Sequence, residues 1–142
     1  TQSLFNDRLF QYQYAFETLM QKPFLGYGLD KYSYIDLSLV PNHMKDIIIG
    51  AHNGYLSILV QFGFLFGSLV IVIILRKVFL LIINYYNMKS HDSDFFIFLL
   101  IYTSLASFYE SFMVGINGFH TFLFWFALSF LSYSKFRKSA GI

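Results

Sequence analysis

A long apolar segment from Tyr55 to Leu75 constrains this chain more than any other feature of its sequence. Gln61 is the only strongly polar side chain in it, and the basic pair Arg76-Lys77 follows it. At a helical rise of about 1.5 Å per residue, a helix of this length matches a bilayer core of roughly 30 Å. Only 13% of the residues are charged, about half the usual fraction in soluble domains. We therefore expect a membrane protein.

Two further apolar runs follow, over about 95–113 and 119–134. Together with the run 55–75, they predict an all-α polytopic membrane protein with about three transmembrane helices. The third run is short for a span, but tilted neighbours and local thinning of the bilayer can accommodate it. The chain then divides into an extracytoplasmic loop region, 1–54, and a transmembrane region, 55–142.

The positions of the basic residues predict the orientation of these helices. The link 114–118 has none, whereas basic residues gather between the first two runs and after the third. They are Arg76, Lys77, Lys89, Lys135, Arg137 and Lys138. By the positive-inside rule, the polar hinge 84–94 and the C-terminal tail lie in the cytoplasm. Residues 1–54 and the link 114–118 then face the opposite side of the membrane.

An amphipathic helix is predicted over about 7–21. Four residues recur there at three- or four-residue spacing, as on one face of a helix. They are Leu9, Tyr12, Phe16 and Leu19. Pro23 disfavours helical geometry in the residue before it, so the helix should end near Lys22. We expect loops in the rest of the region.

Glycines punctuate the chain at two further places. The segment Pro23-Phe24-Leu25-Gly26-Tyr27-Gly28 predicts a turn, in which the glycines permit positive φ or a close backbone approach. Gly63 and Gly67 have the small-xxx-small spacing that favours close helix packing.

His52 and Asn53 stand immediately before the first apolar run. Asn53 suits the N-cap of the helix that follows. A neutral His52 ring at the membrane edge could accept a proton or contact a ligand. The alternative is a structural histidine that only forms hydrogen bonds at the interface.

Two charged residues are further candidates. Arg8 lies beside the predicted apolar face, where it either reaches lipid headgroups or binds phosphate oxygens with its planar guanidinium. Glu110 is the only acid inside a predicted span. An ionisable residue at that depth indicates function, although a structural pairing with Arg8 or a histidine is the alternative.

Several classes of site are not indicated. The chain has no cysteine, which excludes disulfides, thiolate nucleophiles and thiolate metal sites. No carboxylates are spaced as metal ligands around His43 and His52, so we predict no metal and no cofactor. The net charge of +2 is too small to indicate nucleic acid as a partner.

Four motifs occur in a distinctive order: Arg8 with the aromatic Tyr12 four residues later, the turn 23–28, His52-Asn53 opening an apolar run, and Gln61-Phe62-Gly63. In this order they resemble the C-terminal part of the O-antigen ligase and polymerase family of bacterial polytopic glycosyltransferases. Tyr12 stands where tryptophan is common in the family. The resemblance covers roughly the first half of the chain.

The resemblance implies an enzyme of the bacterial cytoplasmic membrane that acts without a metal. Its donor would be a glycan on undecaprenyl diphosphate, its acceptor a sugar hydroxyl, and a chain-length regulator protein would be a further partner. Phe108-Tyr109-Glu110-Ser111 resembles a segment of capsular and O-antigen polymerases, so we predict a polymerase of repeat units. The alternatives are an O-antigen ligase acting on lipid A core and a non-catalytic lipid-binding or transport subunit.

The resemblance also implies roles for individual residues. Arg8 would stabilise the leaving diphosphate, His52 would take the proton of the attacking hydroxyl, and Glu110 would orient His52 or the acceptor. The expected substrate-binding residues are Arg8, Tyr12, Gly26, Gly28 and Asn53. The family usually places a further essential arginine in an earlier external loop, so we expect this chain to be part of a longer protein.

Overall fold

The computed structural model describes residues 2–29, 35–46, 50–85, 91–115 and 118–139. These residues form α-helices and one short 3-10 helix, and no strand occurs among them. The elements are α1 (Gln2–Gln21), η1 (Asn42–Met44), α2 (Gly54–Ile83), α4 (His91–Ala106) and α5 (Phe119–Ser139). The predicted all-α class is thus confirmed for the described part of the chain.

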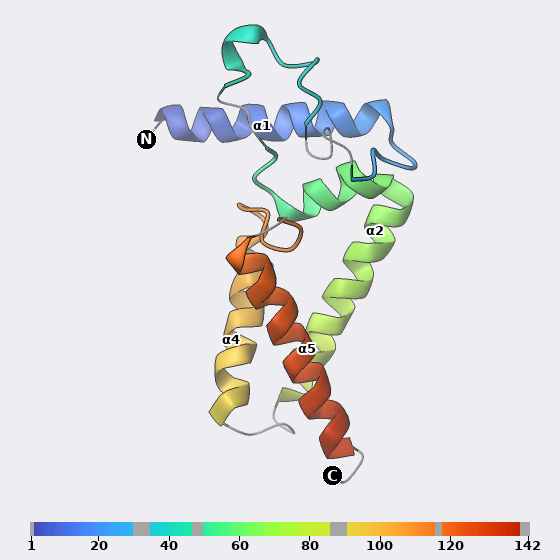
Figure 1. The fold of residues 1–142 in the computed structure, drawn as a ribbon, viewed down its shortest axis with the longest axis vertical. Helices are drawn as coiled ribbons and strands as arrows, with labels where there is room; N and C mark the ends of the chain where they lie inside the picture. The colour runs from blue at the N-terminus through green and yellow to red at the C-terminus, as the bar shows by residue number, and fades with distance from the viewer. Residues whose placement is uncertain (1, 30–34, 47–49, 86–90, 116–117, 140–142) are drawn as a thin grey trace.

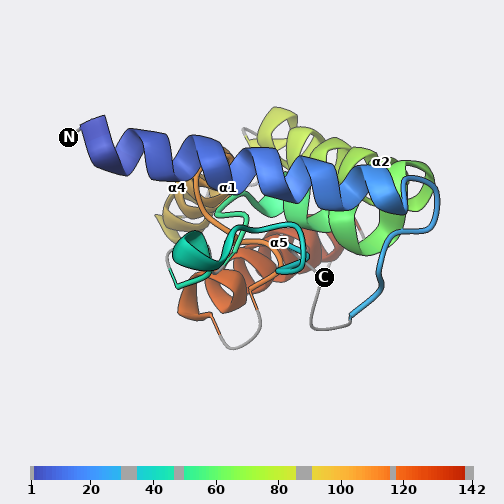
Figure 2. The same ribbon diagram turned by 90° about the horizontal axis from the view of Figure 1, so that it is seen from above.

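The helix α1 lies across one end of the other three helices (Figure 1). Seen from above, α1 crosses α2 and α4, whereas α5 lies to one side of it (Figure 2). From this end α2, α4 and α5 run away from α1, with α4 and α5 side by side. The arrangement brings the start of α2, the end of α4 and one face of α1 together.

Two apolar cores hold the helices. The larger core joins α2, α4 and α5, and the smaller core lies beneath α1. Fully buried residues of the larger core include Ile58, Leu81, Leu100, Phe124 and Leu131. The smaller core consists of Ala15, Ile35, Val40 and Ala51. Because Ala51 precedes His52 directly, this core fixes α1 above the candidate residues.

The helix α1 differs from its prediction in its start and in its buried face. It begins at Gln2 rather than near residue 7, although it ends at Gln21, just before Pro23 as predicted. Leu9 and Phe16 are each 51% exposed. Leu19 is buried as predicted, but the rest of the buried face carries smaller or polar side chains. Among them, the Thr18 hydroxyl accepts a hydrogen bond from the Asp36 N–H at 2.8 Å. This face comprises Gln11, Ala15, Thr18 and Leu19.

The helix α2 is longer than the predicted span and is broken at Gly63, where φ is 70°. The part from Phe64 to Ile83 has a length of about 30 Å at about 1.5 Å per residue, which matches a bilayer core. The helix itself continues beyond residue 75, the predicted end of the span, through Arg76-Lys77. Both basic side chains are exposed, and such long side chains can extend along a helix to reach the headgroup region.

The helices α4 and α5 also differ from the predicted spans. The run 95–113 is helical only to Ala106, after which turns follow, and α5 continues past residue 134 to Ser139. Parts of the predicted hinge and link, residues 86–90 with Lys89 and residues 116–117, lie outside the described residues.

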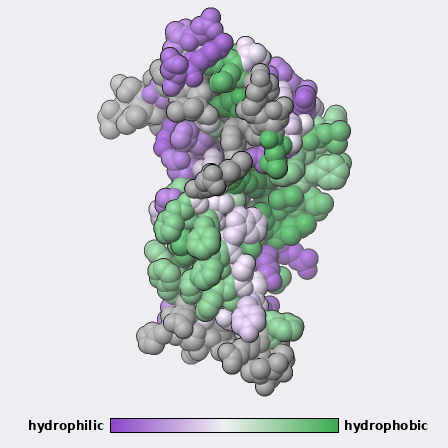
Figure 3. Space-filling view, in the orientation of Figure 1, coloured by the Kyte–Doolittle hydropathy of each residue, from purple (hydrophilic) through white to green (hydrophobic). Residues whose placement is uncertain are grey.

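One described helix, α2, is long and apolar enough to cross a membrane, and the apolar part of α4, Ser93–Ala106, is shorter. Only 33% of the apolar window of α2 is buried, so most of its apolar surface faces outward. Hydrophobic side chains cover much of the visible face of the helices below α1, whereas hydrophilic ones gather at the α1 end (Figure 3). The number of spans and the division at residue 54 remain predictions.

Candidate active site

Asn53 starts α2 and ties it to the end of α4. Its side-chain oxygen accepts a hydrogen bond from the Leu56 N–H at 2.9 Å, so the predicted N-cap is confirmed. Its side-chain nitrogen donates to the Phe108 carbonyl oxygen at 3.0 Å. The Gly54 N–H donates to the carbonyl oxygens of Ser107 and Glu110, at 2.7 and 3.1 Å.

The turn Ser107–Glu110 ends α4, and α1 supplies partners for its carbonyl oxygens. The Tyr12 hydroxyl donates to the Phe108 carbonyl at 3.1 Å, and Arg8 Nη1 donates to the Tyr109 carbonyl at 2.6 Å. A helix C-terminus leaves carbonyls without intrahelical partners, and its partial negative charge attracts cations. Glu110 was predicted to lie inside a span. It lies instead in this turn, because α1 and α2 bind the backbone that would have continued α4.

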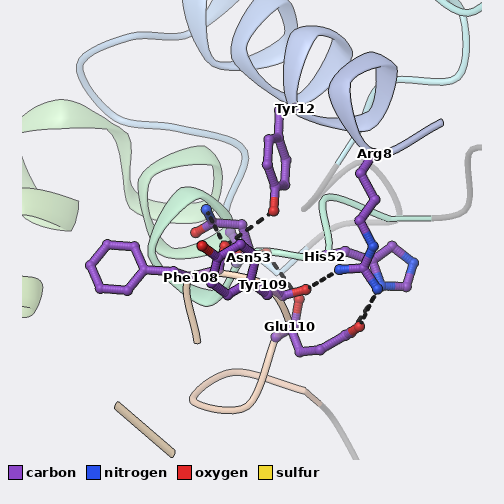
Figure 4. A network of polar contacts seen from close by, with 9 residues as sticks. Arg8, Tyr12, His52, Asn53, Phe108, Tyr109 and Glu110 are labelled. Atoms are coloured by element: carbon purple, nitrogen blue, oxygen red, sulfur yellow. Dashed lines mark hydrogen bonds and ion pairs between the residues drawn. The ribbon is translucent and has the colours of Figure 1, made fainter. Parts of the chain in front are cut away.

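Glu110 joins Arg8 to His52 (Figure 4). Arg8 Nη2 donates to Glu110 Oε1 at 2.8 Å, and His52 Nδ1 lies 2.9 Å from Glu110 Oε2. The proximity of His52 and Glu110 that the sequence indicated is therefore confirmed. The side chains of Arg8, Glu110 and His52 are 42%, 36% and 38% exposed, so a ligand can reach this network.

The contacts shift the protonation equilibria of the network. Burial opposes ionisation of Glu110, but hydrogen bonds from His52 and Arg8 outweigh it and lower the pKa of Glu110. The hydrogen bond to Glu110 raises the pKa of Arg8. Glu110 is thus an anion near neutral pH, and an ionised carboxylate only accepts hydrogen bonds. The hydrogen of the contact therefore belongs to Nδ1 of His52, which leaves Nε2 of a neutral ring as an acceptor.

His52 also has an unusual backbone. Its φ of 42° is the only positive φ outside glycine among the described residues. Such conformations are sparsely populated and concentrate at active sites and ligand-binding segments. No sequence pattern predicted this feature.

Gly26 and Gly28 adopt the positive φ that the turn predicted, 68° and 71°. The backbone of Gly26 packs against Gln61 and Gly63, and the N–H of Gly28 donates to the Gln61 carbonyl at 2.8 Å. Neither glycine belongs to the network of Arg8, Glu110 and His52 in Figure 4. Their role in substrate binding remains a prediction.

Sequence reasoning missed Gly54 and the backbone of Ser107–Glu110. A Cβ on Gly54 would lie 3.3 Å from Ser107 Cβ, so the start of α2 approaches this turn closely. Main-chain carbonyls carry no side-chain signal, and attention was drawn to this segment only by Glu110 and by the resemblance of Phe108–Ser111 to polymerases. Within the described residues, no three His, Cys, Asp or Glu side chains gather as a metal site.

A family model described as O-antigen ligase matches residues 1–72. The match takes in α1, the turn 23–28, His52-Asn53 and most of α2. Glu110 lies beyond it, on the other side of the contact with Arg8 and His52. No curated protein and no solved structure matches the chain.

Proposed function

The chain belongs to the O-antigen ligase family, and we propose that it polymerises undecaprenyl diphosphate-linked oligosaccharide repeat units into a surface polysaccharide. The family and the apolar helix α2 indicate a membrane enzyme of the ligase and polymerase type. The observation that carries the proposal is the contact of Arg8 and His52 with one carboxylate, Glu110.

The proposed reaction is displacement at the anomeric carbon of the donor glycan. The acceptor hydroxyl oxygen forms the new glycosidic bond, and the bond from the anomeric carbon to the diphosphate oxygen breaks. The proton of the hydroxyl passes to Nε2 of His52, which acts as general base. The undecaprenyl diphosphate leaves with the bonding electron pair.

Arg8 stabilises the charge that grows on the leaving diphosphate. A guanidinium has five N–H donors, and two of them are bonded to Tyr109 and Glu110. The remaining donors can meet phosphate oxygens at a half-exposed position, where charge-assisted bonds are stronger than neutral ones. Tyr12 and Asn53 support this arrangement by binding the Phe108 carbonyl.

Glu110 holds His52 in the tautomer and orientation that the reaction needs. Its carboxylate accepts from Nδ1, which keeps Nε2 directed to the substrate, and it stabilises the positive charge that the ring gains with the proton. No step requires a metal. In the alternative, a non-catalytic lipid-binding subunit, Arg8 and His52 would bind lipid phosphate without Glu110. Such a subunit would have no need of a carboxylate that supports proton transfer at His52.

We place the enzyme in the bacterial cytoplasmic membrane as a multi-pass protein, with residues 1–54 extracytoplasmic and the C-terminus cytoplasmic. The basic residues of α5 from Lys135 onward lie at the end of the bundle away from α1 (Figure 1). This separation supports a cytoplasmic C-terminus. The glycan donor and acceptor would then meet at the outer face, and a chain-length regulator protein remains a proposed partner.

An O-antigen ligase is the second candidate, because the matching family carries that description. The polymerase is favoured by the segment Phe108–Ser111, which resembles polymerases and which forms the centre of the site. Analysis of lipid-linked intermediates in a deletion strain separates the two. Single repeat units on the lipid identify a polymerase, and full-length polymer left on the lipid identifies a ligase. Unchanged intermediates and unchanged surface glycan would contradict both.

A further inference from the structure

The break in α2 separates backbone groups that a regular helix would pair. Gly63 has φ 70° and ψ 178°. In an unbroken helix the carbonyl of Val60 would accept from the N–H of Phe64, and the carbonyl of Gln61 would accept from the N–H of Leu65. Unpaired backbone groups at an apolar membrane edge are costly, so these groups need partners from elsewhere.

The turn 23–28 supplies those partners. The Tyr27 N–H donates to the Val60 carbonyl at 3.0 Å, and the Gly28 N–H donates to the Gln61 carbonyl at 2.8 Å. In return, the Phe64 N–H donates to the Pro23 carbonyl at 2.6 Å. Three backbone hydrogen bonds therefore join the segment after α1 to the break in α2. We call the pair of segments 23–28 and 60–64 the backbone clip.

Glycine is required on both sides of the backbone clip. A Cβ on Gly26 would lie 2.4 Å from the Gln61 carbonyl oxygen, and a Cβ on Gly63 would lie 2.2 Å from the Phe24 carbonyl oxygen. Both contacts are to backbone atoms, which cannot move aside as a flexible side chain can. Both glycines also have positive φ, which strains other residues.

We infer that the backbone clip is a positioning device, which holds α1 so that Arg8 meets Glu110. The clip fixes the chain just after Gln21, where α1 ends, and Arg8 lies about 20 Å further along the same helix. Because a helix moves as a stiff rod, a displacement at the clip changes where Arg8 lies. Gly26 and Gly63 thus affect the candidate active site by setting the position of Arg8, without contacting the site themselves.

The test compares Gly26→Ala and Gly63→Ala in the full-length protein. Spin labels at Gln13 on α1 and Phe119 on α5, both exposed, report the position of α1 without any assay of activity. We expect a shifted or broadened distance distribution in both variants. The kinetic readout rests on the proposed function, and there we expect kcat to fall by about 10²-fold, as small misplacements of catalytic groups do.

The pH profile distinguishes positioning from a general loss of structure. A hydrogen bond from Arg8 helps to lower the pKa of Glu110, so displacement of Arg8 raises that pKa and moves the titration of the Glu110 carboxyl, followed by infrared spectroscopy, to higher pH. Arg8→Gln should move this titration in the same direction. The double variant Gly26→Ala/Arg8→Gln should move it no further, because both changes remove the same contact, between Arg8 and Glu110. Additive shifts would overturn the inference.

Two glycines provide controls. A Cβ on Gly50 meets nothing within 4 Å and this residue has no positive φ, so Gly50→Ala should match the wild type in distance and rate. Gly28 has nearly the same positive φ as Gly26, but a Cβ on Gly28 would meet nothing within 4 Å, so Gly28→Ala should have a smaller effect than Gly26→Ala.

A milder variant covers the case in which Gly26→Ala does not fold. Pro23→Ala keeps the carbonyl that accepts from Phe64 and loosens the turn, so it should shift the label distance less, in the same direction. Wild-type distances in Gly26→Ala and Pro23→Ala would contradict the clip. If the wild-type protein shows no transfer activity, the proposed function is contradicted. The label distances would still test the backbone clip, because they do not depend on activity.

Discussion

Glu110 uses its two carboxylate oxygens for different partners, Oε1 for Arg8 and Oε2 for His52. A glutamine can offer only one oxygen, and its amide nitrogen is a donor. Glu110→Gln therefore cannot accept hydrogen bonds from both partners, and keeping the His52 contact would require the other tautomer of the ring. This geometry makes Glu110 the residue through which the two proposed catalytic groups are coupled.

The coupling predicts a dependence of stability on pH. Hydrogen bonds from His52 and Arg8 lower the pKa of Glu110 in the folded protein below its value in the unfolded chain. Its stabilising contribution is therefore complete above the ordinary carboxyl pKa and is lost as the pH falls through the lowered value. Chemical unfolding of wild type and Glu110→Gln in detergent should show a stability difference at pH 7 that disappears in acid. An equal difference at every pH would contradict this prediction.

Arg8→Lys should lower glycan transfer by about 10²-fold, the loss typical when one oriented donor is removed from an anion site. A single ammonium cannot reproduce the fork that spans the Tyr109 carbonyl and Glu110 and still meets a diphosphate. The measurement is transfer by the purified variant at a protein level matched to the wild type. Near-normal transfer would leave Arg8 with a headgroup-anchoring role only.

Residue-level predictions succeeded where the cause was local. Asn53 could be recognised as an N-cap because the cap depends on its immediate neighbours. Arg8 and Glu110 are separated by 102 positions, and no local pattern specifies their contact. His52 and Glu110 could be brought together only by placing both at one membrane edge. The backbone strain at His52 was not predictable, because histidine itself does not require positive φ.

At the scale of elements, periodicity indicated α1 and the burial of Leu19 but misidentified part of its buried face. The spacing of Leu9 and Phe16 suits a core, yet both are exposed, and Ala15 and Thr18 are buried in their place. The break in α2 was missed for a related reason. Gly63 suggested close packing between helices, whereas its actual contact is with the backbone of the turn 23–28.

The start of α2 should be sensitive to side-chain size at Gly54. A Cβ there would lie 3.3 Å from Ser107 Cβ and 3.5 Å from the Glu110 carbonyl oxygen. Gly54→Val should therefore lower the free energy of unfolding by about 1–3 kcal/mol, as overpacking does. Thermal or denaturant unfolding measures this loss, with Gly50→Val as the control at an open position. Equal stability of the two variants would show that α2 and α4 are not tightly joined here.

At the scale of the whole molecule, the charge pattern predicts which end faces the cytoplasm. The chain has no cysteine, so single cysteines can report topology without background. Ser38→Cys, in the loop beside α1, should react with an impermeant thiol reagent added to intact cells. Asn84→Cys, after the last turn of α2, should react only after permeabilisation. Labelling of Asn84→Cys in intact cells would reverse the proposed orientation.

The sequence predicted the helical class of the described residues better than the ends of the individual helices. Apolar composition does not depend on where each helix begins or ends, so the helical class could be predicted without the exact helix ends. The spans themselves depend on where helices end, and the contacts of α1 and α2 with the turn Ser107–Glu110 end α4 early. Such contacts become visible only when the helices are assembled.

Glycan transfer by purified full-length protein, with synthetic lipid-linked donor and a chelator present, shows whether His52 is the general base and Glu110 its support. The variants to compare with the wild type are His52→Ala and Glu110→Gln. We expect His52→Ala to bind the donor but to transfer no glycan, because its base is gone. Glu110→Gln should transfer slowly, because the base remains but is poorly held. Full turnover by His52→Ala, or activity that requires a divalent ion, would contradict the proposed site.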